Sequence, residues 1–179
     1  MNIIRTRKDL KEWLKYEKKL YPLNLFAILT RNQRYYNWKY IKLLRHCEYY
    51  RNSKYKFLLL LFPIYRLRRN LLGAKIGVQI TENCFQKGLL ICHHGSIVVN
   101  RFARIGENAI LHGCNCIGSI DNDDCPIIGN NVEFGVGSIV LGKVKLADNI
   151  KIGANSTVLK DCLESNVTLV GSPAKIIKK

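Results

Sequence analysis

Three of the four histidines in this 179-residue chain lie within twenty residues of one another, a grouping that could support acid–base chemistry. They are His93 and His94, in the stretch ICHHGSIVVN, and His112, in ILHGCNCIG. Histidine is the side chain best suited to take a proton from a hydroxyl group near neutral pH, and such a base typically accelerates a reaction about 10²–10⁴-fold. The cluster therefore predicts a catalytic base, with a purely structural histidine group as the alternative.

A six-residue repeat surrounds these histidines. One apolar residue recurs at every sixth position, in two series separated by a gap of eleven residues: Val99, Ile105, Leu111 and Ile117, then Ile128, Phe134, Val140, Leu146, Ile152 and Val158. Glycine follows this position at residues 106, 118, 129, 135 and 153. A period of six fits flat strands joined at tight corners, whereas it fits neither a 3.6-residue helix nor alternating hairpins. The chain after residue 73 is therefore predicted to coil.

The gap of eleven residues between Ile117 and Ile128 places five extra residues within GSIDNDDCP. An insertion this polar cannot lie inside a regular coil, so we expect it to loop out. Because aliphatic side chains fill the interior of stacked coils, function should reside on such loops and on the outer grooves. A tolerated surface insertion is the alternative.

The chain before the repeat reads as a basic α-helical segment. From Thr6 to about Leu71 it is rich in Leu, Lys, Tyr and Arg, with apolar residues three to seven positions apart. Residues 1–75 hold 19 Lys and Arg against 4 Asp and Glu, a net charge of +15, whereas residues 76–179 hold 10 against 9. We expect a helical segment over residues 1–73, at one end of a β domain over residues 74–179. Its cations would face an anionic glycan or a lipid-linked precursor at a membrane, or would only form a solvated surface.

The most apolar part of this segment is the nine-residue run from Phe57 to Tyr65. It is too short to cross a bilayer, and although it could touch a membrane interface, packing against the rest of the protein is favoured. The sequence shows neither a longer apolar run nor a signal peptide, so we expect a cytoplasmic protein that could lie at the inner face of the membrane. The seven cysteines are then expected to be thiols, mostly within the packed interior.

Three stretches of the β domain resemble the hexapeptide-repeat acyltransferases, and most closely the serine acetyltransferase-like group that includes the polysaccharide O-acetyltransferases. They are residues 88–100, which contain His93, residues 103–113, which end in His112-Gly113, and the C-terminal stretch 151–176, which contains KIGANSTVLKD and VGSPAKI. The resemblance implies a left-handed parallel β-helix with three hexads in each triangular coil. It also implies a homotrimer that binds the acyl donor between subunits.

The resemblance further implies that acetyl-CoA is the acyl donor, that no metal takes part and that His93 is the catalytic base. His93 would take the proton as the acceptor oxygen attacks the thioester, and backbone N–H groups near Gly95 or Gly113 could stabilise the oxyanion. If no residue is inserted in the coil, His94 and His112 should stack about 4.8 Å apart. Cys92 as an acyl-carrying nucleophile is disfavoured, because neighbours on a strand point to opposite faces.

The coenzyme A site follows from the C-terminal stretch. Ala154 and Ser156 match positions where backbone groups meet the pantetheine arm in the family, and Lys175 matches a position near the nucleotide phosphates, where a cation is favourable. The expected coenzyme A contacts are Gly135, Ala154, Ser156, Lys160 and Lys175.

Departures from the family indicate the acceptor. Serine acetyltransferases typically have an aspartate before the catalytic histidine and an Arg-His pair before the proline that re-enters the coil, where this chain has Cys92, Asp124 and Cys125. Without that arginine a free amino acid's carboxylate has no charged partner, and Asp124 would repel it. A sugar hydroxyl of a polysaccharide, such as a capsule, or of its precursor is therefore favoured over L-serine. The expected substrate contacts are Asn115, Asp121, Asp123, Asp124 and Cys125.

Two further readings belong to other function classes. A metal-dependent hydratase on the same fold would hold zinc with three histidines, but its close histidine pair is more widely spaced than His93-His94. A non-enzymatic binding module would use the basic helical segment, in which residues 34–40 form an aromatic-rich run that could stack on bases. No nucleic-acid-binding signature accompanies them, so nucleic acid is not expected as a partner.

Overall fold

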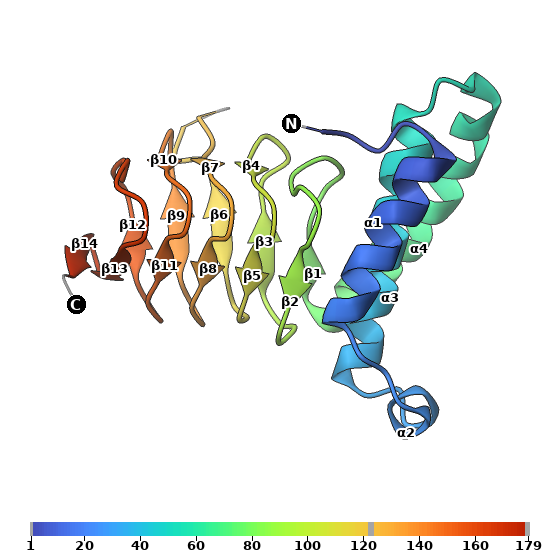
Figure 1. The fold of residues 1–179 in the computed structure, drawn as a ribbon, viewed down its shortest axis with the longest axis horizontal. Coiled ribbons are helices and arrows are strands. Elements are labelled where there is room, and N and C mark those ends of the chain that lie inside the picture. Colours follow the sequence, from blue (N-terminus) through green and yellow to red (C-terminus); the bar gives the residue numbers. More distant parts are fainter. Residues whose placement is uncertain (1, 122–123, 178–179) are drawn as a thin grey trace.

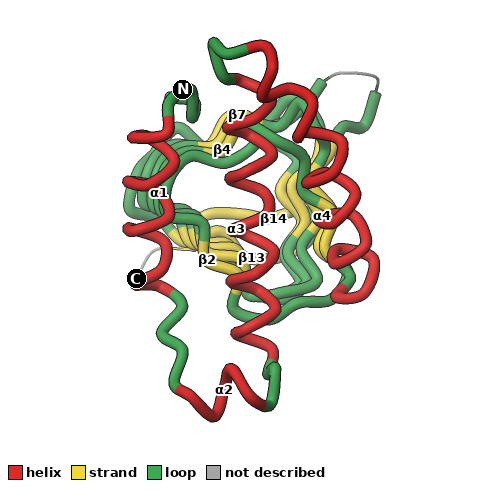
Figure 2. Tube along the Cα trace, turned by 90° about the vertical axis from the view of Figure 1, so that its right-hand side faces the viewer, coloured by secondary structure: helices red, strands yellow, loops and turns green. Residues whose placement is uncertain are grey.

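The computed structural model describes residues 2–121 and 124–177 as a parallel β-helix with α-helices across one end (Figure 1). Figure 2, which looks onto the helical end, shows the coils stacked behind α1, α3 and α4. The strand β14 lies at the opposite end of the coil stack (Figure 1). The structure thus confirms the predicted fold class and the position of the helical segment.

Five short or medium helices make up the N-terminal segment: α1 (Arg7–Leu20), α2 (Leu25–Leu29), α3 (Gln33–Asn52), the 3₁₀ helix η1 (Lys56–Leu61) and α4 (Phe62–Ile76). The side chain of Thr6 caps α1 in a reciprocal capping box with Asp9, and the side chain of Asn32 caps α3. No helix in this described part of the chain is long and apolar enough to cross a membrane.

The helical segment ends at Ile76, three residues beyond the predicted boundary at Gly73. Gly77, with φ of 67°, adopts the left-handed conformation that commonly ends a helix. Gly73 instead lies inside α4, where a Cβ atom would come within 2.5 Å of the carbonyl oxygen of Val78. This glycine therefore permits close packing of the helix on the first coil, and does not end the helix.

Among the described residues, fourteen short strands form the β-helix and its end: β1 (Val78–Gln79), β2 (Leu90–Ile91), β3 (Ile97–Val99), β4 (Arg104–Ile105), β5 (Ile110–Leu111), β6 (Cys116–Gly118), β7 (Ile127–Ile128), β8 (Glu133–Phe134), β9 (Ile139–Leu141), β10 (Lys145–Leu146), β11 (Lys151–Ile152), β12 (Thr157–Val158), β13 (Thr168–Gly171) and β14 (Ala174–Ile177). They stack into three sheets, in the orders β1-β3-β6-β9-β12, β10-β7-β4 and β14-β13-β11-β8-β5-β2. All pairs are parallel except β13 with β14, whose hairpin ends the third sheet.

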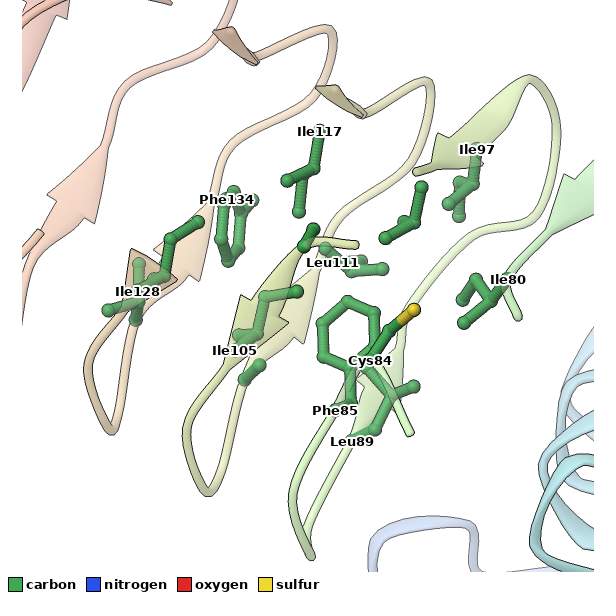
Figure 3. Close-up of a cluster of buried hydrophobic side chains, with 14 of the residues drawn as sticks. Ile80, Cys84, Phe85, Leu89, Ile97, Ile105, Leu111, Ile117, Ile128 and Phe134 are labelled. Atoms are coloured by element: carbon green, nitrogen blue, oxygen red, sulfur yellow. The ribbon is translucent and has the colours of Figure 1, made fainter. Parts of the chain in front are cut away.

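The core confirms the six-residue repeat, because all ten repeat positions from Val99 to Val158 are buried. Several of them converge in the interior with Phe85 and Leu89 of the first coil (Figure 3). Leu111 pairs with Phe134, and Phe134 pairs in turn with Ile152. The numbering therefore advances by 134 − 111 = 23 over the coil that contains the insertion, but only by 152 − 134 = 18 over the next coil. The difference, 23 − 18 = 5, confirms that the five extra residues loop out without disturbing the coils.

A buried ionic cluster joins the helices to the first coil. The guanidinium of Arg45 contacts the carboxylates of Glu17, at 2.7 Å, and Glu48, at 2.9 Å, and donates to the carbonyl oxygen of Gln86. Glu17 also accepts a hydrogen bond from the backbone N–H of Gly88. Buried charges are tolerated only when they are paired and hydrogen-bonded, so this cluster, which we call the Arg45 cluster, fixes α1 and α3 on the coil.

The apolar run from Phe57 to Tyr65 does not pack as the sequence predicts. The sequence favours packing against the protein, but Phe57, Leu59, Leu60 and Ile64 are exposed. The core is instead covered by the opposite side of α4, where Leu72 and Ile76 are buried.

Candidate active site

The three clustered histidines lie near the bend that connects β2 to β3. In the pairing of β2 with β5, Ile91 lies beside Leu111, an advance of 111 − 91 = 20 in the numbering. On the far side of the bend, in the pairing of β3 with β6, Val98 lies beside Cys116, an advance of 116 − 98 = 18. The bend therefore contains two more residues than the corresponding bend of the next coil.

This insertion changes which side chains are neighbours. His93 lies over Gly113, where a Cβ atom would be 3.2 Å from the His93 carbonyl oxygen and 3.3 Å from its Cβ. Continuing the register of the two strands puts Cys92 opposite His112. The predicted stacking of His94 on His112 is therefore wrong, because it required a coil without insertions.

Helix α3 supplies a partner for the exposed His93. Gln33, the first residue of the helix, places its Nε2 3.3 Å from Nδ1 of His93 and 3.4 Å from the carbonyl oxygen of Cys92. With the amide in this orientation, a neutral His93 carries its proton on Nε2. A half-turn of the Gln33 amide would place Oε1 against a protonated Nδ1 and leave Nε2 as the proton acceptor.

His94 is held by the same helix. Its Nδ1 donates to Oδ1 of Asn37 at 3.1 Å, and the buried Asn37 in turn donates from Nδ2 to the carbonyl oxygen of Ile91 at 3.0 Å. Burial and, to a smaller extent, the neighbouring His93 lower the pKa of His94. This environment keeps His94 neutral at pH 7, with the lone pair on Nε2.

His112 begins a row of polar side chains that crosses three adjacent strands of one sheet. Its Nε2 donates to Oε1 of Glu133 at 2.8 Å, and Oε2 of Glu133 lies 3.3 Å from Nζ of Lys151. The hydrogen bond from His112, followed by the contact with Lys151, lowers the pKa of the Glu133 carboxyl. The carboxylate therefore orients the His112 ring and leaves its Nδ1 as the proton-accepting nitrogen.

The thiol of Cys92 lies in the same region. Burial, together with the negative charge of Glu133, raises the pKa of Cys92. A thiol that stays protonated is a weak nucleophile, so this environment gives no support to an acyl-carrying cysteine.

The residues predicted to contact coenzyme A lie toward the C-terminal end of the β-helix. Gly135 stacks directly on the next coil, since a Cβ atom there would be 2.6 Å from the backbone nitrogen of Ala154. Ala154, Lys160 and Lys175 are exposed, and the two lysines could meet phosphates. Ser156 is buried, and its hydroxyl accepts a hydrogen bond from the backbone N–H of Gly171. Its own N–H donates to the carbonyl oxygen of Gly153 and its carbonyl oxygen accepts from the N–H of Ile139, so Ser156 is engaged in holding the coils together.

The predicted substrate contacts are not equally exposed. Asn115 is fully buried, accepts from the N–H of Gly113 at 2.9 Å and donates to the carbonyl oxygen of Gly135, so it supports the coils from inside. The N–H of Gly113 is thereby also taken, which corrects its suggested role as an oxyanion donor. Cys125 is buried in the hydrophobic core.

The acidic loop retains exposed carboxylates. Asp121 and Asp124 are exposed, and the backbone N–H of Asp124 donates to the carbonyl oxygen of Asp121. Oδ1 of Asp124 lies 3.8 Å from Nζ of Lys143. Asp123 lies outside the described residues. Across residues 2–121 and 124–177, no three His, Cys, Asp or Glu side chains converge in an arrangement that could hold a metal ion.

Sequence reasoning missed Gln33, Asn37 and Glu133. The first two lie far upstream of the histidines that they contact, in a segment read only for its charge and aromatic content. The position of Glu133 could have been predicted from the looped insertion. A regular coil advances the numbering by 18 and the insertion adds five, which leads from Ile110 to Glu133, and these two residues pair.

Comparisons with known proteins place these features in context. No family model matches the chain. Serine acetyltransferase of Helicobacter pylori strain 26695 is 39% identical over 110 residues, which are 60% of this chain and 58% of that protein. Serine acetyltransferase of Staphylococcus epidermidis RP62A is 36% identical over 110 residues, 60% of this chain and 47% of that protein. The chain thus spans about half the length of these relatives.

Solved structures extend the likeness to the helices. Serine acetyltransferase from Brucella abortus strain S19 superposes with a TM-score of 0.75 at 21% identity, covering 96% of this chain and 70% of that one. Soybean serine acetyltransferase complexed with serine gives a TM-score of 0.73 at 24% identity, covering 94% and 69%. The fold is therefore shared over nearly the whole chain. The sequence relatives and the shared fold together fit a hexapeptide-repeat protein of the serine acetyltransferase-like group.

Proposed function

We propose that this protein is an O-acetyltransferase that moves the acetyl group of acetyl-CoA to a hydroxyl group, with His93 as the general base. The observation that carries the proposal is the position of His93. It lies on an exposed bend, packed on Gly113 and held by Gln33, in a chain whose relatives are serine acetyltransferases.

The chemistry requires one proton acceptor at the attacking oxygen. His93 takes the hydroxyl proton as that oxygen attacks the thioester carbonyl, and it returns the proton to the departing thiolate of coenzyme A. The base needs Nε2 unprotonated, so we propose that the Gln33 amide turns its oxygen to Nδ1 in the active form and gives up the contact of its Nε2 with the carbonyl oxygen of Cys92. His94 and His112 line the same region with fixed tautomers, and they orient the acceptor.

The acyl donor is proposed to lie along the C-terminal coils. Close stacking at Gly135 and the exposed Ala154 leave a flat backbone surface there, while Lys160 and Lys175 supply positive charge for phosphates. A homotrimer, with the donor between subunits, is the assembly we propose from the likeness to the solved relatives.

L-Serine is the first candidate acceptor, because the relatives with matching sequence carry that activity in their names. This ranking reverses the one drawn from the sequence, where a sugar hydroxyl is favoured.

A sugar hydroxyl is the second candidate, and Asp124 is the observation that favours it. Its carboxylate is exposed where the family's arginine is expected, and its lysine contact is a long one of 3.8 Å. A carboxylate accepts hydrogen bonds from hydroxyl groups but repels the carboxylate of serine.

The test is thiol release from acetyl-CoA with L-serine, nucleotide sugars and bacterial glycan fragments, for the wild type and for His93→Ala. His46→Ala, which removes a histidine far from the bend, is the matched control, and thermal unfolding checks that both variants fold. Loss of thiol release in His93→Ala, with release kept in His46→Ala, supports His93 as the base. Release with serine supports the first acceptor and release with sugars alone the second, whereas no release with any acceptor contradicts the proposal.

A further inference from the structure

A stripe of exposed apolar side chains runs along η1 and α4. Its members alternate at spacings of three and four residues, and each is more than half exposed: Phe57 at 68%, Leu60 at 76%, Ile64 at 53%, Leu67 at 59% and Leu71 at 64%. Residues at these spacings lie on one face of a helix. We call these five side chains the α4 stripe.

The stripe faces away from the protein. The buried residues of α4 are Arg69, Leu72, Gly73 and Ile76. At 3.6 residues per turn, these positions lie on the side of the helix opposite Ile64, Leu67 and Leu71. Scattered exposed apolar side chains are ordinary, but a continuous apolar row of this length marks a surface that contacts something else.

The charges around the stripe have a single sign. From Ser53 to Ile76 the sequence holds six Lys and Arg and no Asp or Glu. Arg69 is used internally, in a buried ion pair with Glu82. The remaining five cations belong to none of the ion pairs found among the described residues: Lys54, Lys56, Arg66, Arg68 and Lys75.

We propose that the α4 stripe docks the protein onto an anionic lipid bilayer. The apolar row enters the boundary between headgroups and acyl chains, and the cations beside it contact lipid phosphates. A second copy of the chain fits this surface less well, because two stripes would bring like charges together. Docking is independent of acetyl transfer.

The size of the effect follows from the two contributions. Each cation near an anionic membrane surface strengthens binding about fivefold, so Arg66→Gln with Arg68→Gln should weaken it about 25-fold. Replacing Leu60 and Leu67 with Ser should weaken it about tenfold or more for each side chain that enters the membrane. Salt should weaken the binding of the wild type further.

The experiment is co-sedimentation with two kinds of vesicle. One is phosphatidylcholine alone, and in the other about 30% of the lipid is anionic phosphatidylglycerol. Two variants change the surface: Leu60→Ser with Leu67→Ser, and Arg66→Gln with Arg68→Gln. Their matched controls are Leu163→Ser, which removes a leucine exposed to 73% elsewhere, and Lys11→Gln with Lys15→Gln on α1. Thermal unfolding verifies that each variant folds.

Salt-sensitive binding to anionic vesicles, lost in both stripe variants and kept in both controls, is the expected result. Absence of binding by the folded wild type overturns the proposal. So does equal loss in the controls. Light scattering adds a further outcome: if the stripe variants lower the molar mass while no protein binds vesicles, the stripe contacts a second copy and the proposal is wrong.

Discussion

Replacing Gly113 with Ala tests whether the coil beneath His93 sets the position of the proposed base. Gly113 has a φ of 125°, and a Cβ atom there would lie 3.2 Å from the carbonyl oxygen of His93. Gly95, in the same bend as His93, offers a matched control. Its φ is 113°, but a Cβ atom there would meet no atom within 4 Å. The two alanine variants share the backbone strain and differ in the contact with His93.

The strain should cost both variants about 1–3 kcal/mol of unfolding free energy, because L side chains rarely adopt this conformation. For a chain of this size the melting temperature should fall by about 2–12 °C in each case. Gly113→Ala must in addition move the His93 backbone by a few tenths of an ångström. Since a displacement of about 1 Å can cost about 100-fold in rate, kcat should fall about two- to fivefold in Gly113→Ala relative to Gly95→Ala.

The assay combines thermal unfolding with thiol release at saturating acetyl-CoA. A kcat for Gly113→Ala that equals that of Gly95→Ala would refute the reasoning, because contact with His93 is the difference built into the pair. If Gly113→Ala melts like the wild type, the positive φ has been accommodated by a shift of the coil and the strain argument fails.

Two further predictions concern charged groups. Arg45→Met should cost about 3–5 kcal/mol at pH 7, since it leaves buried carboxylates without a cation. Burial already raises the pKa of Glu48, and a raised carboxyl pKa gives stability that is lost as the pH rises. The free energy of unfolding of this variant, measured in urea, should therefore increase when the pH is lowered from 8 to 5. A free energy of unfolding that does not change with pH would contradict this. Glu133→Gln should cost about 0.5–1 kcal/mol at pH 7. Because His112 and Lys151 lower the pKa of Glu133, the difference from the wild type should vanish between about pH 5 and about pH 3, and a difference that persists at low pH would refute the assignment.

The fold could be predicted from the sequence because each hexad repeats the same demand for one buried apolar side chain. The position of every repeat residue from Val99 to Val158 followed from that demand, and so did the looped insertion after Ile117. The same periodicity failed at the bend after Ile91, because nothing in HHGS distinguishes an inserted pair of residues from a regular corner.

The site could be predicted only in part, for a related reason. The histidines are recognisable by type and spacing, but their partners Gln33 and Asn37 come from a helix, and no periodicity links that helix to the coil. Burial was equally hidden for Asn115, whose amide satisfies backbone groups inside the coils. Polar residues in loops were therefore assigned to substrate where some of them only support the structure.

The extra residues in the bend between β2 and β3 have a wider consequence. A perfect β-helix has translational symmetry along its axis, so every coil presents the same surface and no coil is suited to a unique task. Two inserted residues break that symmetry at one coil, and α3 contacts the chain at this same place through Gln33 and Asn37. The defect and the helix together give this coil a bend that the next coil lacks. New sites on such a scaffold can therefore arise by shifting the defect along the axis while the core remains unchanged.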